Sequence, residues 1–307
     1  MSVARKPRGF CGEYCRFLTA DGLELQGFLS EPERNARLCL IHVHGWDGNF
    51  YENRFIDHAA LVATQQGVAF FAFNNRGHDY IADLLRPARH DYVQVGGIYE
   101  RFADCVPDIR AALAFLCRRG YRRFVLQGHS HGAIKVAHYL ASTRDPSIVG
   151  LVLLSPSDDL AWGRAQMGTR FRRALGMAHR LVRSGKGRQL MPAGLFPYPV
   201  SAATFLDCFA HDSITGMFNL SRTDRNSFPE LARVRVPVLL AIGTVEEAFA
   251  TRPRDFVDAA RQAMAGTPSF TGAVIAGAPH NYLGHETKLA AVLRRWLVEH
   301  APAWLKP

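Results

Sequence analysis

A Gly-x-Ser-x-Gly motif occupies residues 128–132, with Ser130 at its centre. The apolar run 124–127 precedes the motif, and a segment with helical character, 133–142, follows it. In a strained turn between a strand and a helix, small residues let the backbones approach and push the serine hydroxyl outward. This context predicts that Ser130 is a nucleophile.

The expected partner of Ser130 is a histidine, because a serine hydroxyl is a poor nucleophile until an imidazole accepts its proton. His280 follows the last apolar run, 270–276. A carboxylate must orient that ring and stabilise the imidazolium that forms. Glu246, just after the apolar run 236–242, is the first choice, and the chain order serine, acid, histidine is the one found with this type of turn.

Three other carboxylates compete for the role of the acid. Glu247 is the neighbour of Glu246, while Asp158 and Asp159 follow the apolar run 148–154. Spacing in the sequence excludes none of them. Each could also be a solvated loop charge, which is the common place for an acidic side chain.

An oxyanion that forms during acyl transfer needs hydrogen-bond donors already in place. The usual donors are the amide after the nucleophile and an amide from the loop after an early strand. His131 would provide the first amide. Trp46, in the loop 44–48, would provide the second.

Four histidines lie near the predicted nucleophile in the sequence pattern, namely His42, His44, His129 and His131. Such crowding raises the question of a zinc site, but no His-Glu-x-x-His motif occurs. We therefore expect these rings to be hydrogen-bonded packing groups and expect no metal and no cofactor.

These motifs resemble those of the α/β-hydrolase superfamily. The resemblance rests on the serine motif, the His44-Gly45 turn, the segment 74–78 and His280, and it extends over about residues 21–300. The segment 74–78 is similar to the Asp-x-Arg-Gly-x-Gly segment of esterase-like and aminopeptidase-like members, where it is usually structural. The run 97–115 has a weaker similarity to siderophore-ester hydrolases. The resemblance implies a serine hydrolase and names no substrate.

Strand and helix patterns alternate along the chain, which predicts an α/β fold with a mostly parallel central sheet. Two short alternating runs around Asp21-Gly22 predict an antiparallel hairpin at the N-terminal end. A possible helix at 99–119 contains Pro107, which would mark a boundary or a kink. The other expected strands are 37–44, 68–73, 124–127, 148–154, 236–242 and 270–276, and the other expected helices are 53–66, 133–142 and 286–300.

Glycines and prolines break the regular pattern between residues 156 and 229. We expect a helical cap at 157–229, inserted into an α/β-hydrolase core made of 12–156 and 230–307. Ligands of open α/β sheets bind at the carboxyl ends of the strands. A cap inserted after such an end would lie over the active site and shape the substrate pocket.

The charge balance favours anionic partners, since 37 Lys and Arg against 27 Asp and Glu give a net charge of +10. Nucleic-acid binding is not expected, because no zinc finger, RNP motif or basic heptad region occurs. The stretch 160–200 carries eight Arg and Lys residues and no acid. This stretch would either select an anionic small-molecule substrate or serve as a solvated surface.

The remaining bulk features predict a cytoplasmic protein without a membrane span. The apolar runs are far shorter than the ~20 residues that a membrane helix needs. Residues 9–19 contain Glu13 and Arg16, where a signal peptide would be apolar. Six scattered cysteines fit reduced thiols better than a disulfide framework.

Three functions are compatible with this sequence. The first is hydrolysis of a carboxylic ester or a related acyl bond through an acyl-enzyme on Ser130. The second is transfer of the same acyl group to an alcohol or amine, including ring closure of a biosynthetic product. The third is a catalytically silent binding protein with a hydrolase fold, which would not need the complete order Ser130, acid, His280.

Overall fold

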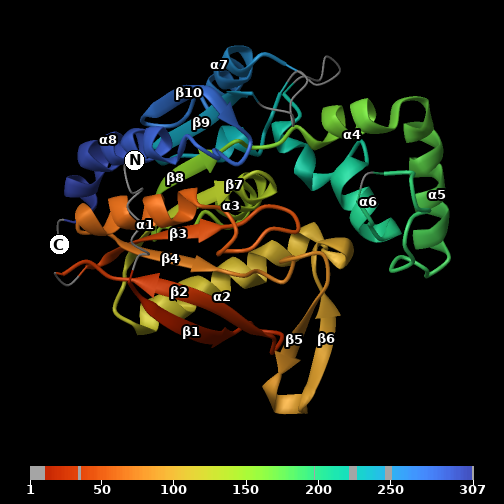
Figure 1. The fold of residues 1–307 in the computed structure, drawn as a ribbon, viewed down its shortest axis with the longest axis horizontal. Coiled ribbons are helices and arrows are strands. Elements are labelled where there is room, and N and C mark those ends of the chain that lie inside the picture. Colours follow the sequence, from red (N-terminus) through yellow and green to blue (C-terminus); the bar gives the residue numbers. More distant parts are fainter. Residues whose placement is uncertain (1–10, 34–35, 197, 221–226, 246–250, 306–307) are drawn as a thin grey trace, which may run out of the picture.

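An eight-stranded sheet forms the centre of the computed structural model, which describes residues 11–33, 36–196, 198–220, 227–245 and 251–305. The strand order is β1-β2-β4-β3-β7-β8-β9-β10 (Figure 1). The bounds are Glu13–Leu18 (β1), Glu24–Ser30 (β2), Leu38–Val43 (β3), Ala69–Phe73 (β4), Arg123–His129 (β7), Ile148–Leu154 (β8), Val238–Val245 (β9) and Phe270–Pro279 (β10).

The sheet is mostly parallel, as the sequence predicts. β1 and β2 form the expected antiparallel hairpin, and β2 also pairs antiparallel with β4. All other neighbouring pairs, from β4 and β3 through to β9 and β10, are parallel. The carboxyl ends of the parallel strands therefore meet at one edge, where open α/β sheets bind their ligands.

Helices cover both faces of the sheet, because successive side chains of a strand point to opposite faces. In β3, Leu38 and Leu40 pack in an apolar cluster with residues of α1 and α8, whereas Cys39 and Ile41 pack in a second cluster with residues of α2, α3 and α7 (Figure 1). These helices are Phe55–Gln65 (α1), Cys105–Arg118 (α2), His131–Thr143 (α3), Pro253–Ala263 (α7) and Glu286–Trp304 (α8).

Among the described residues between β8 and β9, three α-helices form what we call the helical lobe: α4 (Asp159–Met167), α5 (Phe171–Arg183) and α6 (Ala202–Phe209). They lie together beyond the carboxyl end of β8, beside the sheet and not over either face (Figure 1). The lobe has an apolar cluster of its own, in which Phe171 and Phe205 are buried. It therefore packs as a small unit attached to the core.

Two details differ from the sequence-based expectations. A second hairpin, β5 (Ala82–Arg86) and β6 (Asp91–Val95), has no counterpart in the prediction. Helix α2 begins at Cys105, and only short 3-10 turns occupy 97–104. Pro107 then falls in the first turn of α2, where a missing backbone N–H costs no helical hydrogen bond, so it neither kinks nor ends the helix.

Candidate active site

Ser130 lies in the turn between β7 and α3 with φ 56° and ψ −128°. A positive φ is a costly backbone conformation for a serine and is usually kept for a functional reason. The flanking glycines make the turn possible. A Cβ on Gly128 would collide with the Gly132 carbonyl, and a Cβ on Gly132 would collide with the Val43 carbonyl.

A cavity of about 410 Å³ opens beside this turn. Ser130 and His280 both line it, although they are 150 residues apart in the sequence. Trp46 and His131, which carry the predicted oxyanion amides, line the same cavity. The fold thus brings these four predicted site residues together at one place.

His280 directly follows β10, and its backbone is held by a residue that the sequence analysis treated only as packing. The Nε2–H of His129 donates to the His280 carbonyl oxygen at 2.9 Å, and the two ring centroids are 4.9 Å apart. Burial holds the pKa of His129 well below its usual value, and a positive charge on His280 would lower it further. A neutral His129 therefore ties the nucleophile turn to the loop that carries His280.

The four candidate acids have different surroundings. Glu246 and Glu247 lie outside the described residues. The Asp158 carboxylate caps α4 by accepting the Ala161 amide at 3.1 Å. Asp159 accepts hydrogen bonds from other groups, the Nδ1–H of His131 at 3.0 Å and the Ser157 hydroxyl at 2.6 Å. Each aspartate thus has at least one hydrogen-bond partner among the described residues.

The loop after β3 runs past the nucleophile. A Cβ on Gly45 would lie only 3.1 Å from the Ser130 Cβ, so the loop backbone is close to the serine. The Trp46 indole N–H anchors the loop by donating to the Gly97 carbonyl at 2.6 Å. His44 accepts the Asn75 amide at Nε2, 3.1 Å away, and bonds the Gly45 carbonyl through Nδ1 at 2.8 Å.

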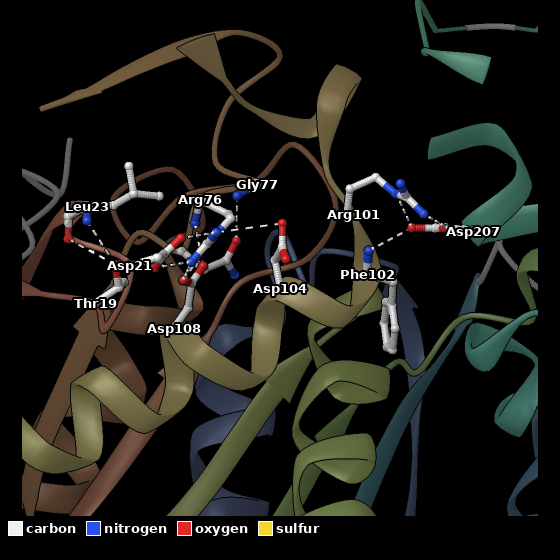
Figure 2. Close-up of polar contacts among 11 residues, drawn as sticks. Thr19, Asp21, Leu23, Arg76, Gly77, Arg101, Phe102, Asp104, Asp108 and Asp207 are labelled. Atoms are coloured by element: carbon white, nitrogen blue, oxygen red, sulfur yellow. Dashed lines mark hydrogen bonds and ion pairs between the residues drawn. The ribbon is translucent and has the colours of Figure 1, made fainter. Parts of the chain in front are cut away.

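Arg76, in the segment that resembles Asp-x-Arg-Gly-x-Gly, serves as a structural tie. Its guanidinium donates to Asp108 at 2.7 and 2.9 Å and to Asp21 at 2.9 Å, and its amide also donates to Asp108 (Figure 2). The contacts join the N-terminal hairpin, the loop after β4 and helix α2. Burial raises the pKa of Asp108, while the Arg76 charge opposes that rise.

A second tie connects the lobe with the core. Asp207 of α6 accepts from the Arg101 side chain at 2.8 Å and from the Phe102 amide at 3.0 Å (Figure 2). The Phe102 ring in turn packs edge-on against the His131 ring, with centroids 5.2 Å apart. The position of the lobe is therefore coupled to the residue that follows the nucleophile.

The basic residues of the stretch 160–200 do not face the cavity. All eight are exposed, and none of them is among its lining residues. The structure therefore does not support the expectation that they select an anionic substrate inside the pocket. They are Arg164, Arg170, Arg172, Arg173, Arg180, Arg183, Lys186 and Arg188.

The histidines near the site are held by protein groups. His42 bonds the Gln127 side chain at 2.9 Å, and burial lowers its pKa to about 3. Nowhere in the described ranges do three or more His, Cys, Asp or Glu side chains form a group that could hold a metal ion. No helix in these ranges is both long and apolar enough to cross a membrane.

The comparisons with known proteins define the class. A family model described as "Alpha/beta hydrolase family" matches residues 40–294, so the chain belongs to the α/β-hydrolase family. The comparison of the sequence with curated proteins gave no match.

Solved structures share the fold at low sequence identity. Est1E from Butyrivibrio proteoclasticus, solved with ferulic acid bound, is 18% identical with a TM-score of 0.64, covering 94% of this chain and 100% of that one. The Pyrococcus furiosus esterase Pf2001 is 16% identical with a TM-score of 0.56, covering 93% of each chain. DcsB, in complex with its substrate analogue, is 12% identical with a TM-score of 0.63, covering 93% and 99%. The likeness shows the fold alone.

Proposed function

We propose that this protein is a serine hydrolase that cleaves a carboxylic ester or a related acyl bond through an acyl-enzyme on Ser130. The observation that carries the proposal is the placement of Ser130, in its strained turn, and His280 on one cavity. Membership of the α/β-hydrolase family and the likeness to the Pyrococcus furiosus esterase Pf2001 support it.

The proposed reaction has two half-reactions. His280 takes the hydroxyl proton of Ser130 while Oγ attacks the substrate carbonyl carbon. The amides of Trp46 and His131 stabilise the oxyanion, and the leaving alcohol departs with the proton held by His280. A water then attacks the acyl-enzyme while His280 takes its proton. The bond between Oγ and the acyl carbon breaks as His280 returns that proton to Oγ, and the carboxylic acid leaves.

Glu246 is the acid that we assign to His280, on the basis of strand register. β9 ends at Val245, which is paired with Pro279 of β10. Glu246 directly follows Val245 in the chain, and His280 directly follows Pro279. The bonding of Asp158 to the Ala161 amide and of Asp159 to His131 leaves the two aspartates less suited to this role.

We also infer that residues 157–229 act as a cap on a core made of 12–156 and 230–307. Trp162, Cys208 and Phe209 of the lobe line the same cavity as Ser130. The lobe would therefore contact the substrate, and its ties through Asp207 would hold it in register with the nucleophile turn.

Competition between water and a second nucleophile tests the acyl-enzyme. Esters of one acid with different alcohols all lead to the same acyl-enzyme, so with methanol present the ratio of free acid to methyl ester should not depend on the leaving alcohol. The ratio is measured by chromatography of the products for nitrophenyl, phenyl and ethyl esters.

A ratio that changes with the leaving alcohol would contradict a common intermediate. Products that consist almost entirely of the methyl ester at low methanol concentration would identify the protein as an acyltransferase that uses the same serine.

A further inference from the structure

The described lining of the cavity at Ser130 has a charge opposite to that of the whole chain. Its described lining includes the carboxylates of Asp47, Glu52 and Asp159, and neither Lys nor Arg occurs in that part of the lining. The chain as a whole carries a net charge of +10. The described part of this wall therefore favours a cation over an anion.

Asp47 is a partly buried carboxylate of this lining without a paired cation among the described residues. Neither Asp47 nor Glu52 forms an ion pair with any described residue, whereas Asp159 accepts hydrogen bonds from His131 and Ser157. Burial raises the pKa of Asp47 to about 6, and the nearby charges of Glu52 and Glu100 add to the rise. The Tyr80 hydroxyl and Lys135 oppose it, but Lys135 is itself bonded to Glu100 at 2.5 Å. A cation in the cavity would stabilise the charged form of Asp47.

Aromatic rings form much of the remaining wall. Tyr198 lies 6.0 Å from Trp46, 6.2 Å from Trp162 and 6.2 Å from Tyr80, measured between ring centroids. All four residues line the cavity, together with Phe209. The faces of Trp and Tyr rings attract cations through their quadrupoles, most strongly where water is excluded.

His131 adds a polar atom, Nε2, that has no hydrogen-bond partner among the described residues. Its side chain is only 3% exposed and lines the cavity. Because a carboxylate can only accept, Nδ1–H donates to Asp159. Nε2 has no hydrogen bond to any residue in the described ranges, so the side chain offers the cavity an unpartnered polar atom.

We propose that the cavity is built for an acyl substrate that carries an ammonium group, held between the Asp47 carboxylate and the aromatic wall of Trp46, Trp162 and Tyr198. This inference rests on the proposed function, since it names the substrate class of the same site. It replaces the anionic substrate that the composition of the chain suggests.

Two pairs of esters matched in size test the proposal. In the first pair, the leaving alcohol of one ester ends in a trimethylammonium group, and that of the other ends in the uncharged tert-butyl group of the same shape. In the second pair, the same two groups end the acyl chain. We expect kcat/KM at pH 8 to be at least about tenfold higher for the cationic member of at least one pair. Equal values within both pairs would overturn the proposal.

Removal of the carboxylate should remove the preference. Asp47→Asn keeps the size of the side chain. Asparagine, like aspartate, tolerates the positive φ of 51° at this position. We expect the cationic preference to fall to within about threefold of unity. Asp83→Asn makes the same change of net charge at an exposed site outside the cavity, and it should leave the preference unchanged. Equal ratios in the wild type and Asp47→Asn would contradict the role of Asp47.

The preference should also depend on pH in a defined direction. As pH falls through about 6, Asp47 takes up a proton and loses its charge, so the ratio of the two kcat/KM values should fall. Protonation of His280 slows both esters alike and cancels in the ratio. The trimethylammonium charge is permanent, so a ratio that is constant from pH 5 to pH 8 would contradict the proposal.

A binding measurement separates this proposal from the proposed function. In Ser130→Ala no covalent step can occur, yet phenyltrimethylammonium should bind at least about tenfold more tightly than tert-butylbenzene, as followed by tryptophan fluorescence. Equal binding with an active wild-type enzyme would overturn the cation site and leave the esterase standing. If Ser130→Ala prefers phenyltrimethylammonium but the wild-type protein has no esterase activity, the cation site stands and the proposed esterase function is overturned.

Discussion

Ser130→Ala should lower the turnover of an activated ester by at least about a thousandfold and leave the fold intact. The alanine has no oxygen with which to form the acyl-enzyme, while the oxyanion amides and the cavity remain and keep some catalysis above that of water. Initial rates with a nitrophenyl ester measure the loss, and circular dichroism checks the fold.

Ser142→Ala is the matched control, since Ser142 lies exposed on the same helix α3. It should keep the wild-type rate. His280→Ala should lose about as much activity as Ser130→Ala, and the double variant little more, because the two residues act as one unit. A Ser130→Ala protein that keeps more than a tenth of the wild-type turnover rules out the proposed nucleophile.

The second large effect concerns the acid. Glu246→Gln should lower turnover by several powers of ten, up to about 10⁴, because an amide in this place favours the wrong tautomer of His280. Glu247→Gln should change the rate by no more than a few fold. Steady-state kinetics of the two variants, which differ by one position and carry the same change of charge, give the comparison.

Asp159→Asn tests one of the two aspartates that compete with Glu246. This variant disturbs the His131 side chain and leaves the proposed pair of Glu246 and His280 in place. Its loss of turnover should therefore be far smaller than that of Glu246→Gln. A loss confined to Glu247→Gln, or mild losses in both glutamate variants with a large loss in Asp159→Asn, would contradict the assignment of Glu246.

The elements that position the site are predictable because their signals are local. The turn at Ser130 needs glycines at fixed offsets, and the apolar runs that become β3, β7 and β10 are fully or partly buried in the sheet. The hairpin of β5 and β6 is not predictable in this way. It carries no two-residue turn of the Asn-Gly kind, and its strands are joined through a 3-10 turn at Pro87 and a left-handed His90.

Side chains whose role depends on distant contacts could not be predicted. His129 acts through a carbonyl 151 residues away, and Asp47 becomes notable only because a cavity forms around it. The basic residues of the lobe illustrate the same limit. The composition of this stretch indicates a positive region, but the sequence does not tell which of the basic side chains face the cavity. In the structure, none of the eight lines it.

Covalent labelling with a fluorophosphonate tests the central claim most directly, because only an activated serine hydroxyl displaces the fluoride. Intact-protein mass spectrometry should show one adduct for each chain, and peptide mapping should place it on Ser130. Ser130→Ala and His280→Ala proteins should show no adduct under the same conditions. An unlabelled but folded wild-type protein, or an adduct that survives in Ser130→Ala, would contradict the account.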